Sequence, residues 1–213
     1  LEEMLEILLT ASRKYLGRKI KVATKMYTDA ELLNFILSNN KKHLEKSIGK
    51  RLLEIKRFFG MDISSFLKNY HPLTAEQFFS YNSGAVQVCF EDGLNHSLAV
   101  YSEQLSIILL PEELSSDGFT KCHPLSEEQF VSKEIKSCLN TICRDIRIWT
   151  LKEEFESEEA KEVAISYLLS NNHELFYCIY LHEDLDSDYL LLEKDVPRKK
   201  VNSCFSVAIG DYV

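Results

Sequence analysis

The sequence predicts an α+β fold, in which N-terminal helices pack with a mostly antiparallel sheet formed by two hairpin regions. Three observations predict it. Apolar residues recur at helical spacing before Pro72, they alternate with polar residues after Gly84, and two dipeptides typical of tight turns lie within the alternating part. We expect a helical portion over residues 1–80 and a β-rich portion over residues 81–213, which together can form one continuous domain.

The helical portion contains one clear start signal. Thr28 to Glu31 forms a capping box, in which the Thr28 hydroxyl accepts from a backbone N–H and the Glu31 carboxylate reaches back. The helix that it opens is expected to end at residues 39–40. A second, basic amphipathic helix is predicted over residues 41–57. The apolar spacing of this segment runs through Leu44, Ile48, Leu52, Ile55 and Phe59 and stops at Gly60.

The β-rich portion repeats one arrangement. Residues 86–113 and 164–195 each read as a strand, a tight turn, a strand, a loop and an apolar strand. The turns are Asp92–Gly93 and Asn171–Asn172, and both are typical of the type I′ geometry that joins hairpin strands. The repeat is either a duplicated module or two neighbouring parts of one sheet. Few identical residues support duplication, so the second interpretation is favoured.

The stretch between the two hairpin regions carries three further predictions. Residues 111–124 are polar and acidic, as in a loop, and residues 126–140 favour a helix. Residues 146–149 then alternate as a strand. Burial in the core is the expected place of Trp149, with an anchor in a protein interface as the alternative.

Charge is divided unevenly along the chain. Residues 1–72 hold 14 Lys and Arg against 8 Asp and Glu, a net charge of +6, whereas residues 73–213 hold 11 against 25, a net charge of −14. An acidic surface repels nucleic acids and anionic membranes and attracts basic proteins. Simple solubility explains the acidity of many proteins, so the charge favours a binding role without naming the partner.

The candidate partner-binding residues are the densest acidic groups of the second portion. They are Glu153, Glu154, Glu156, Glu158, Asp184, Asp186 and Asp188. Clustered carboxylates accelerate association with basic partners, and the alternative is a solvated acidic face. The segment from Asp184 also matches the start of a calcium loop. However, Tyr189 replaces the glycine that such a loop requires and Asp195 replaces its bidentate glutamate, so we expect no metal site.

No sequential catalytic or cofactor motif is present. The chain lacks a nucleophile elbow, a phosphate loop, a dinucleotide fingerprint and an H-E-x-x-H helix. We therefore expect a protein that is not an enzyme and uses no cofactor. A hydrolase-type enzyme with a Cys/His site assembled from distant positions is the first alternative. Nucleic-acid binding through the basic helix 41–57 is the second and is less favoured.

Cysteine use and hydropathy bear on the compartment. The six cysteines are scattered and include no C-x-x-C pair, which indicates buried free thiols in a reducing cytosol rather than disulfides or zinc ligands. No apolar run reaches the roughly 18 residues of a membrane span. The first residues carry acids where a secretory signal carries bases. We expect a cytoplasmic protein with no membrane partner.

The strand–turn–strand segments resemble those of the small acidic immunity proteins that bacteria make against polymorphic toxins. The resemblance rests on VQVCFEDG at residues 86–93 and YLLSNNHELF at residues 167–176, together with the acidic balance and the missing catalytic signatures. It covers residues 84–196 and implies a cytoplasmic protein that occupies the active site of a cognate toxin, often a basic nuclease. The leading hypothesis is accordingly a non-enzymatic immunity protein that neutralises a basic toxin through an acidic surface.

Overall fold

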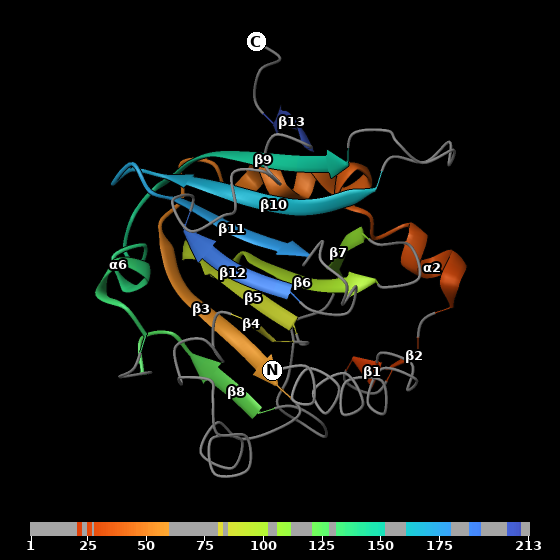
Figure 1. Ribbon diagram of the computed structural model, residues 1–213, viewed down its shortest axis with the longest axis horizontal. Coiled ribbons are helices and arrows are strands. Elements are labelled where there is room, and N and C mark those ends of the chain that lie inside the picture. The colour runs from red at the N-terminus through yellow and green to blue at the C-terminus, as the bar shows by residue number, and fades with distance from the viewer. Residues whose placement is uncertain are drawn as a thin grey trace, which may run out of the picture.

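The strands assemble into antiparallel sheets (Figure 1). The computed structural model describes residues 21–22, 25–26, 28–59, 81–82, 85–101, 106–111, 121–127, 131–151, 161–179, 188–192 and 204–209. One sheet has six strands, in the order β13 (Cys204–Ile209), β9 (Cys143–Leu151), β10 (Glu162–Leu169), β11 (Glu174–Ile179), β12 (Asp188–Leu192) and β4 (Tyr81–Asn82). The other has five, in the order β7 (Ser106–Leu110), β6 (Asn95–Tyr101), β5 (Ala85–Phe90), β3 (Leu52–Phe59) and β8 (Lys121–Pro124). A separate pair is formed by β1 (Lys21–Val22) and β2 (Lys25–Met26).

Short helices complete the described part of the chain. They are α2 (Asp29–Leu33), α3 (Lys41–Leu44) and α6 (Lys133–Lys136), with the 3-10 turns η1 (Leu37–Asn40), η2 (Glu45–Ser47) and η3 (Glu91–Gly93). The predicted capping box opens α2: Thr28 N donates to Glu31 Oε2 at 2.8 Å, and Glu31 N donates to Thr28 Oγ1 at 3.3 Å. The α+β class is thus confirmed, although strands dominate. Among these helices, none is long and apolar enough to cross a membrane.

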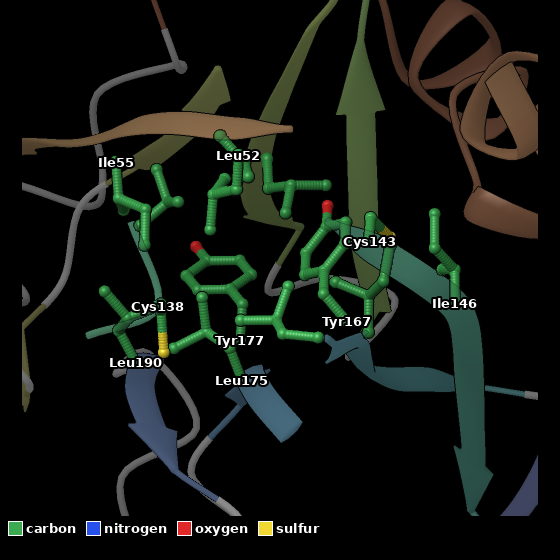
Figure 2. Close-up of a cluster of buried hydrophobic side chains, with 14 of the residues drawn as sticks. Leu52, Ile55, Cys138, Cys143, Ile146, Tyr167, Leu175, Tyr177 and Leu190 are labelled. Atoms are coloured by element: carbon green, nitrogen blue, oxygen red, sulfur yellow. The ribbon is translucent and has the colours of Figure 1, made fainter. Parts of the chain in front are cut away.

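The main core lies between the two large sheets. Alternate residues of each strand point inward, so that Tyr167 of β10 and Tyr177 of β11 pack beside Leu52 and Ile55 of β3 (Figure 2). A smaller cluster covers the other face of the five-stranded sheet. It consists of Leu32, Ala99, Tyr101, Ile108 and Leu110. The boundary predicted near residue 80 lies outside the described residues, and strands from both sides of it share one sheet and one core.

The basic helix predicted over residues 41–57 is wrong in its second half. Helical structure ends at Ser47, and Gly49 then takes a φ of +84°, which stops the helix. Residues 52–59 form β3, between β5 and β8. The spacing of Leu52 and Ile55 suggested a helix because a β-bulge lies between them, and the extra residue returns both side chains to the same face.

Four other local predictions need correction. The helix opened by the capping box, expected to end at residues 39–40, ends at Leu33, and a separate 3-10 turn covers Leu37–Asn40. Residues 121–124, expected in a loop, form β8 against β3. Within residues 126–140, described apart from 128–130, only Lys133–Lys136 is α-helical and the residues after it form turns. Trp149 lies on the face of β9 opposite to the core residues Ile146 and Ile148 and is half-buried, because side chains alternate across a strand.

The two hairpin regions belong to two halves of the molecule. The first half comprises α3, η2, β3, β5, β6 and β7, and the second comprises α6, β9, β10, β11 and β12. In each half a short helix precedes four strands that pair in succession. Both dipeptides lie in tight turns, but only Asp92–Gly93 has the positive φ at both residues that a type I′ turn requires, +61° and +71°. At Asn171–Asn172 only Asn172 has a positive φ, +66°, so the type I′ geometry predicted there is wrong.

A short antiparallel pairing joins the halves where their first strands begin. Four backbone hydrogen bonds make it: Gly49 N to Cys143 O (2.8 Å), Asn140 N to Leu52 O (2.7 Å), Leu52 N to Thr141 O (2.8 Å) and Cys143 N to Lys50 O (2.8 Å). Exchanging residues 49–52 with residues 140–143 maps this set of bonds onto itself. The β-bridge between Arg51 and Ile142 therefore marks a local pseudo-two-fold axis.

The equivalence extends along both halves. Glu91 N donates to Arg51 O at 2.9 Å, and Ser170 N donates to Ile142 O at 2.8 Å. Equivalent positions are 91 residues apart at the first strands and 79 residues apart in the hairpins. The two hairpin regions thus lie in different sheets and repeat the same bonds, which fits a duplicated unit rather than neighbouring parts of one sheet.

The first strands of the two halves also share an irregularity. A bulge leaves Leu53 out of register in β3 and Arg144 out of register in β9. Directly after it, the carboxylates of Glu54 and Asp145 each accept from the next backbone amide, at 2.9 and 2.8 Å. The sequences EIKRF and DIRIW follow from these positions, with acid, isoleucine, base and aromatic side chains in the same order.

Candidate functional site

The candidate binding residues belong to two connections of the second half. Glu153, Glu154, Glu156 and Glu158 connect β9 to β10, and Asp184 and Asp186 connect β11 to β12; all six lie outside the described residues. Asp188 is the first residue of β12, where its backbone is paired with Ile179 and Asn82.

The strand ends that flank these two connections lie at the same end of the six-stranded sheet. Thr150 is opposite Glu162 at the start of β10, and Ala164 is opposite Cys178 near the end of β11. Figure 1 shows β9, β10, β11 and β12 side by side in this order. Because neighbouring strands are antiparallel, the end of β9, the start of β10, the end of β11 and the start of β12 lie next to one another at this end of the sheet.

Glu162 begins β10 but does not belong to an exposed acidic surface. It is 4% exposed, and its two carboxylate oxygens each lie 3.1 Å from Ser38 N, which donates to them. Burial raises the pKa of this carboxyl group, and the hydrogen bonds from Ser38 oppose the shift. Glu162 therefore anchors the η1 turn to the six-stranded sheet, directly after the β9–β10 connection.

A hydrogen-bonded group occupies the outer face of the six-stranded sheet near the same end. Trp149 Nε1 donates to Ser166 Oγ at 2.8 Å, and Ser166 Oγ donates to Glu174 Oε1 at 2.6 Å. Arg147 Nη1 lies 3.3 Å from the other Glu174 oxygen, and the Phe176 ring lies 5.4 Å from the Trp149 ring. Sequence reasoning missed this group, although the alternation of β9 already placed Arg147 and Trp149 on one face.

The structure weakens the nucleic-acid alternative. Residues 41–57 do not form one basic helix, and Arg57 is fully buried with its guanidinium carbon 6.0 Å from the centre of the Tyr177 ring. Lys46 and Arg51 stay exposed, on a 3-10 turn and beside β3 respectively. The continuous basic face that would follow a phosphate backbone is therefore not formed.

Burial makes three of the described thiols poor nucleophiles. Cys138 and Cys143 are fully buried, and burial raises the pKa of each to about 12. Burial also raises the pKa of the partly buried Cys122. Since the thiolate is the reactive form, these three positions do not favour the Cys/His alternative.

The described part of the chain contains no group of three or more His, Cys, Asp or Glu placed to hold a metal ion. Comparisons of the whole chain with family models, with curated proteins and with solved structures find no match.

Proposed function

We propose that this protein is a non-enzymatic binding protein. Specifically, it is an immunity protein that binds and neutralises a basic toxin domain through the acidic connections of its second half. The proposal includes a cytoplasmic location, where a cognate toxin would have to be neutralised. One observation carries the proposal. The pairing of β9, β10, β11 and β12 places the strand ends that flank both acid-rich connections at the same end of the six-stranded sheet.

The comparison of the two halves supports this choice of surface. The β3–β5 connection is the counterpart of the β9–β10 connection, and over residues 60–84 it holds two acids and one lysine. The β6–β7 connection, residues 102–105, holds one acid. Residues 152–161 hold five glutamates and two lysines, and residues 180–187 hold three acids and no lysine or arginine. The two connections of the second half are thus more acidic than their counterparts in the first half, whereas the framework is common to both halves.

The electrostatic role predicted for these acids is kinetic. Clustered carboxylates raise the association rate with a cationic protein and fix its orientation, and salt screens the effect. Trp149 is partly exposed near the same strand ends, and its indole donates to the buried Ser166. Tryptophan is among the residues that contribute most at protein interfaces.

The test begins with a native pull-down of the full chain and mass spectrometry, compared with the product of the adjoining reading frame. Association of the purified partner is then measured for E153K/E154K/E156K. The matched control, E45K/E127K/E134K, makes the same charge change at exposed positions elsewhere. We expect the association rate at low salt to fall at least about tenfold in the first variant, and less than about twofold in the control.

The second acidic connection is tested separately with D184K/D186K. If both connections border one binding surface, this variant slows association as well, and combining it with the first slows it further. A partner without a basic surface, or equal rates for the charge-reversed and control variants, would refute the proposed function.

A further inference from the structure

A buried ring cluster spans the two halves close to their junction. His96 of β6, in the first half, is fully buried, and its Nδ1 lies 3.0 Å from the hydroxyl oxygen of Tyr167 of β10, in the second half. Tyr167 is also buried, and its ring lies roughly parallel to the imidazole with the ring centres 5.8 Å apart. The rings of Phe90 and His43 approach His96 at 5.1 and 5.5 Å.

The surroundings of His96 favour the neutral imidazole. Its Nε2 is buried and has no hydrogen-bond partner of full geometry among the described residues, and the His43 backbone only partly offsets the cost of a charge on the ring. The groups that face His96 are His43 from α3, Tyr167 from β10 and the apolar Phe90 from β5. Behind them, Cys143 of β9 contributes electrostatically to the raised pKa of Tyr167, after the larger effect of burial. Among the described residues only His43 contributes a charge that shifts the pKa of His96, and no carboxylate does. A proton on Nε2 would therefore create a buried cation without a counter-charge.

We propose that this cluster is an acid-sensitive latch between the two halves: neutral His96 holds β6 against β10, and protonation of His96 releases them. The latch is independent of the proposed binding function, because it lies in the core rather than at the acidic connections.

The direction of the pH effect follows from the burial. Burial lowers the pKa of His96 from 6.5 to about 3; the electrostatic effect of His43 adds to the shift, and a hydrogen bond with the His43 backbone opposes it. The unfolded chain therefore takes up a proton below pH 6.5 that the folded chain does not bind until about pH 3. Stability contributed by the neutral ring is present above pH 6.5 and is lost as pH falls, by about tenfold in the unfolding equilibrium constant per pH unit.

The experiment compares urea unfolding of the full chain with that of H96Q, H43Q and Y167F between pH 7 and pH 4. In H96Q the side chain is neutral at every pH. We expect the unfolding equilibrium constant of the natural sequence, relative to that of H96Q, to rise about a hundredfold over this range. Y167F keeps His96 and should keep most of the pH dependence while being less stable throughout.

Two measurements on the natural sequence keep the proposal testable if H96Q does not fold. The His96 ring signals in nuclear magnetic resonance should not titrate in the folded state between pH 7.5 and pH 4.5. Exchange of the junction amides of Gly49 and Cys143, corrected for intrinsic rates, should accelerate as pH falls.

The proposal is overturned if the pH dependence of the unfolding equilibrium constant persists in H96Q, or if it is lost in H43Q instead. A titration midpoint near pH 6.5 for the His96 ring in the folded state would also overturn it. Acceleration of exchange that spares the junction amides would also overturn it.

Discussion

The two halves of this molecule share a backbone and differ in the chemistry of their outer faces. Phe58 of the first half is equivalent to Trp149 of the second and is almost fully buried, whereas Trp149 is half-buried. Gln87 is equivalent to Ser166, but only Ser166 bonds to an aromatic side chain and a carboxylate.

Some structural features occur in both halves of the molecule, and others occur in only one. The bulge, the tight turn and the reciprocal junction bonds recur in both halves, so they belong to the requirements of folding. The acidic connections and the Trp149 group occur in one half, so folding of the unit does not require them. This difference is why we place the proposed function in the second half.

The largest expected effect tests whether the halves are equivalent in the core. Ile55 and Ile146 hold the same position in β3 and β9, and both are fully buried. We expect I55A and I146A each to lower the free energy of unfolding by about 2–5 kcal/mol, through lost burial and a cavity. Urea unfolding measures both. Leu53, which is 45% exposed, supplies the control L53A with little loss. A large loss in only one of the two isoleucine variants would break the equivalence.

An intermediate effect tests the difference between the outer faces. S166A removes the oxygen between Trp149 and the buried Glu174, so we expect a loss of about 1–3 kcal/mol. The emission of Trp149 should shift too, since it is the only tryptophan. The counterpart is Q87L, in which the buried amide nitrogen, unpartnered in the described structure, gives way to an apolar group; we expect little change. Equal losses in both variants would contradict the contrast.

The smallest effect concerns the residues before the first strands. Gly49 and Asn140 are equivalent and have φ of +84° and +63°. A Cβ at residue 49 meets no atom within 4 Å, so G49A tests backbone conformation alone. We expect it to cost about 1–2 kcal/mol, whereas N140G should be neutral or slightly stabilising. Thermal unfolding measures both, and a fully tolerated G49A would count against a shared left-handed requirement.

Sequence reasoning identified the hairpins well because their signals are local. Asp92–Gly93 and Asn171–Asn172 specify turns by their own backbone preferences, and alternating residues on either side specify the strands. It failed at residues 52–59 because a bulged strand and a helix can place the same apolar residues on one face. It placed the acidic residues in two connections but had no means of deciding that their flanking strands are neighbours.

By itself, the sequence determined the capping box, the tight turns, the inward and outward residues of the regular strands and the acidity of the second portion. These features depend on contacts between residues close in the chain or on composition. Only the tertiary structure decided that the hairpin regions lie in two facing sheets, that residues 49–52 pair with residues 140–143, and that His96 meets Tyr167. Such contacts join positions more than 70 residues apart, and their partners are selected by packing of the whole core, which no local pattern encodes.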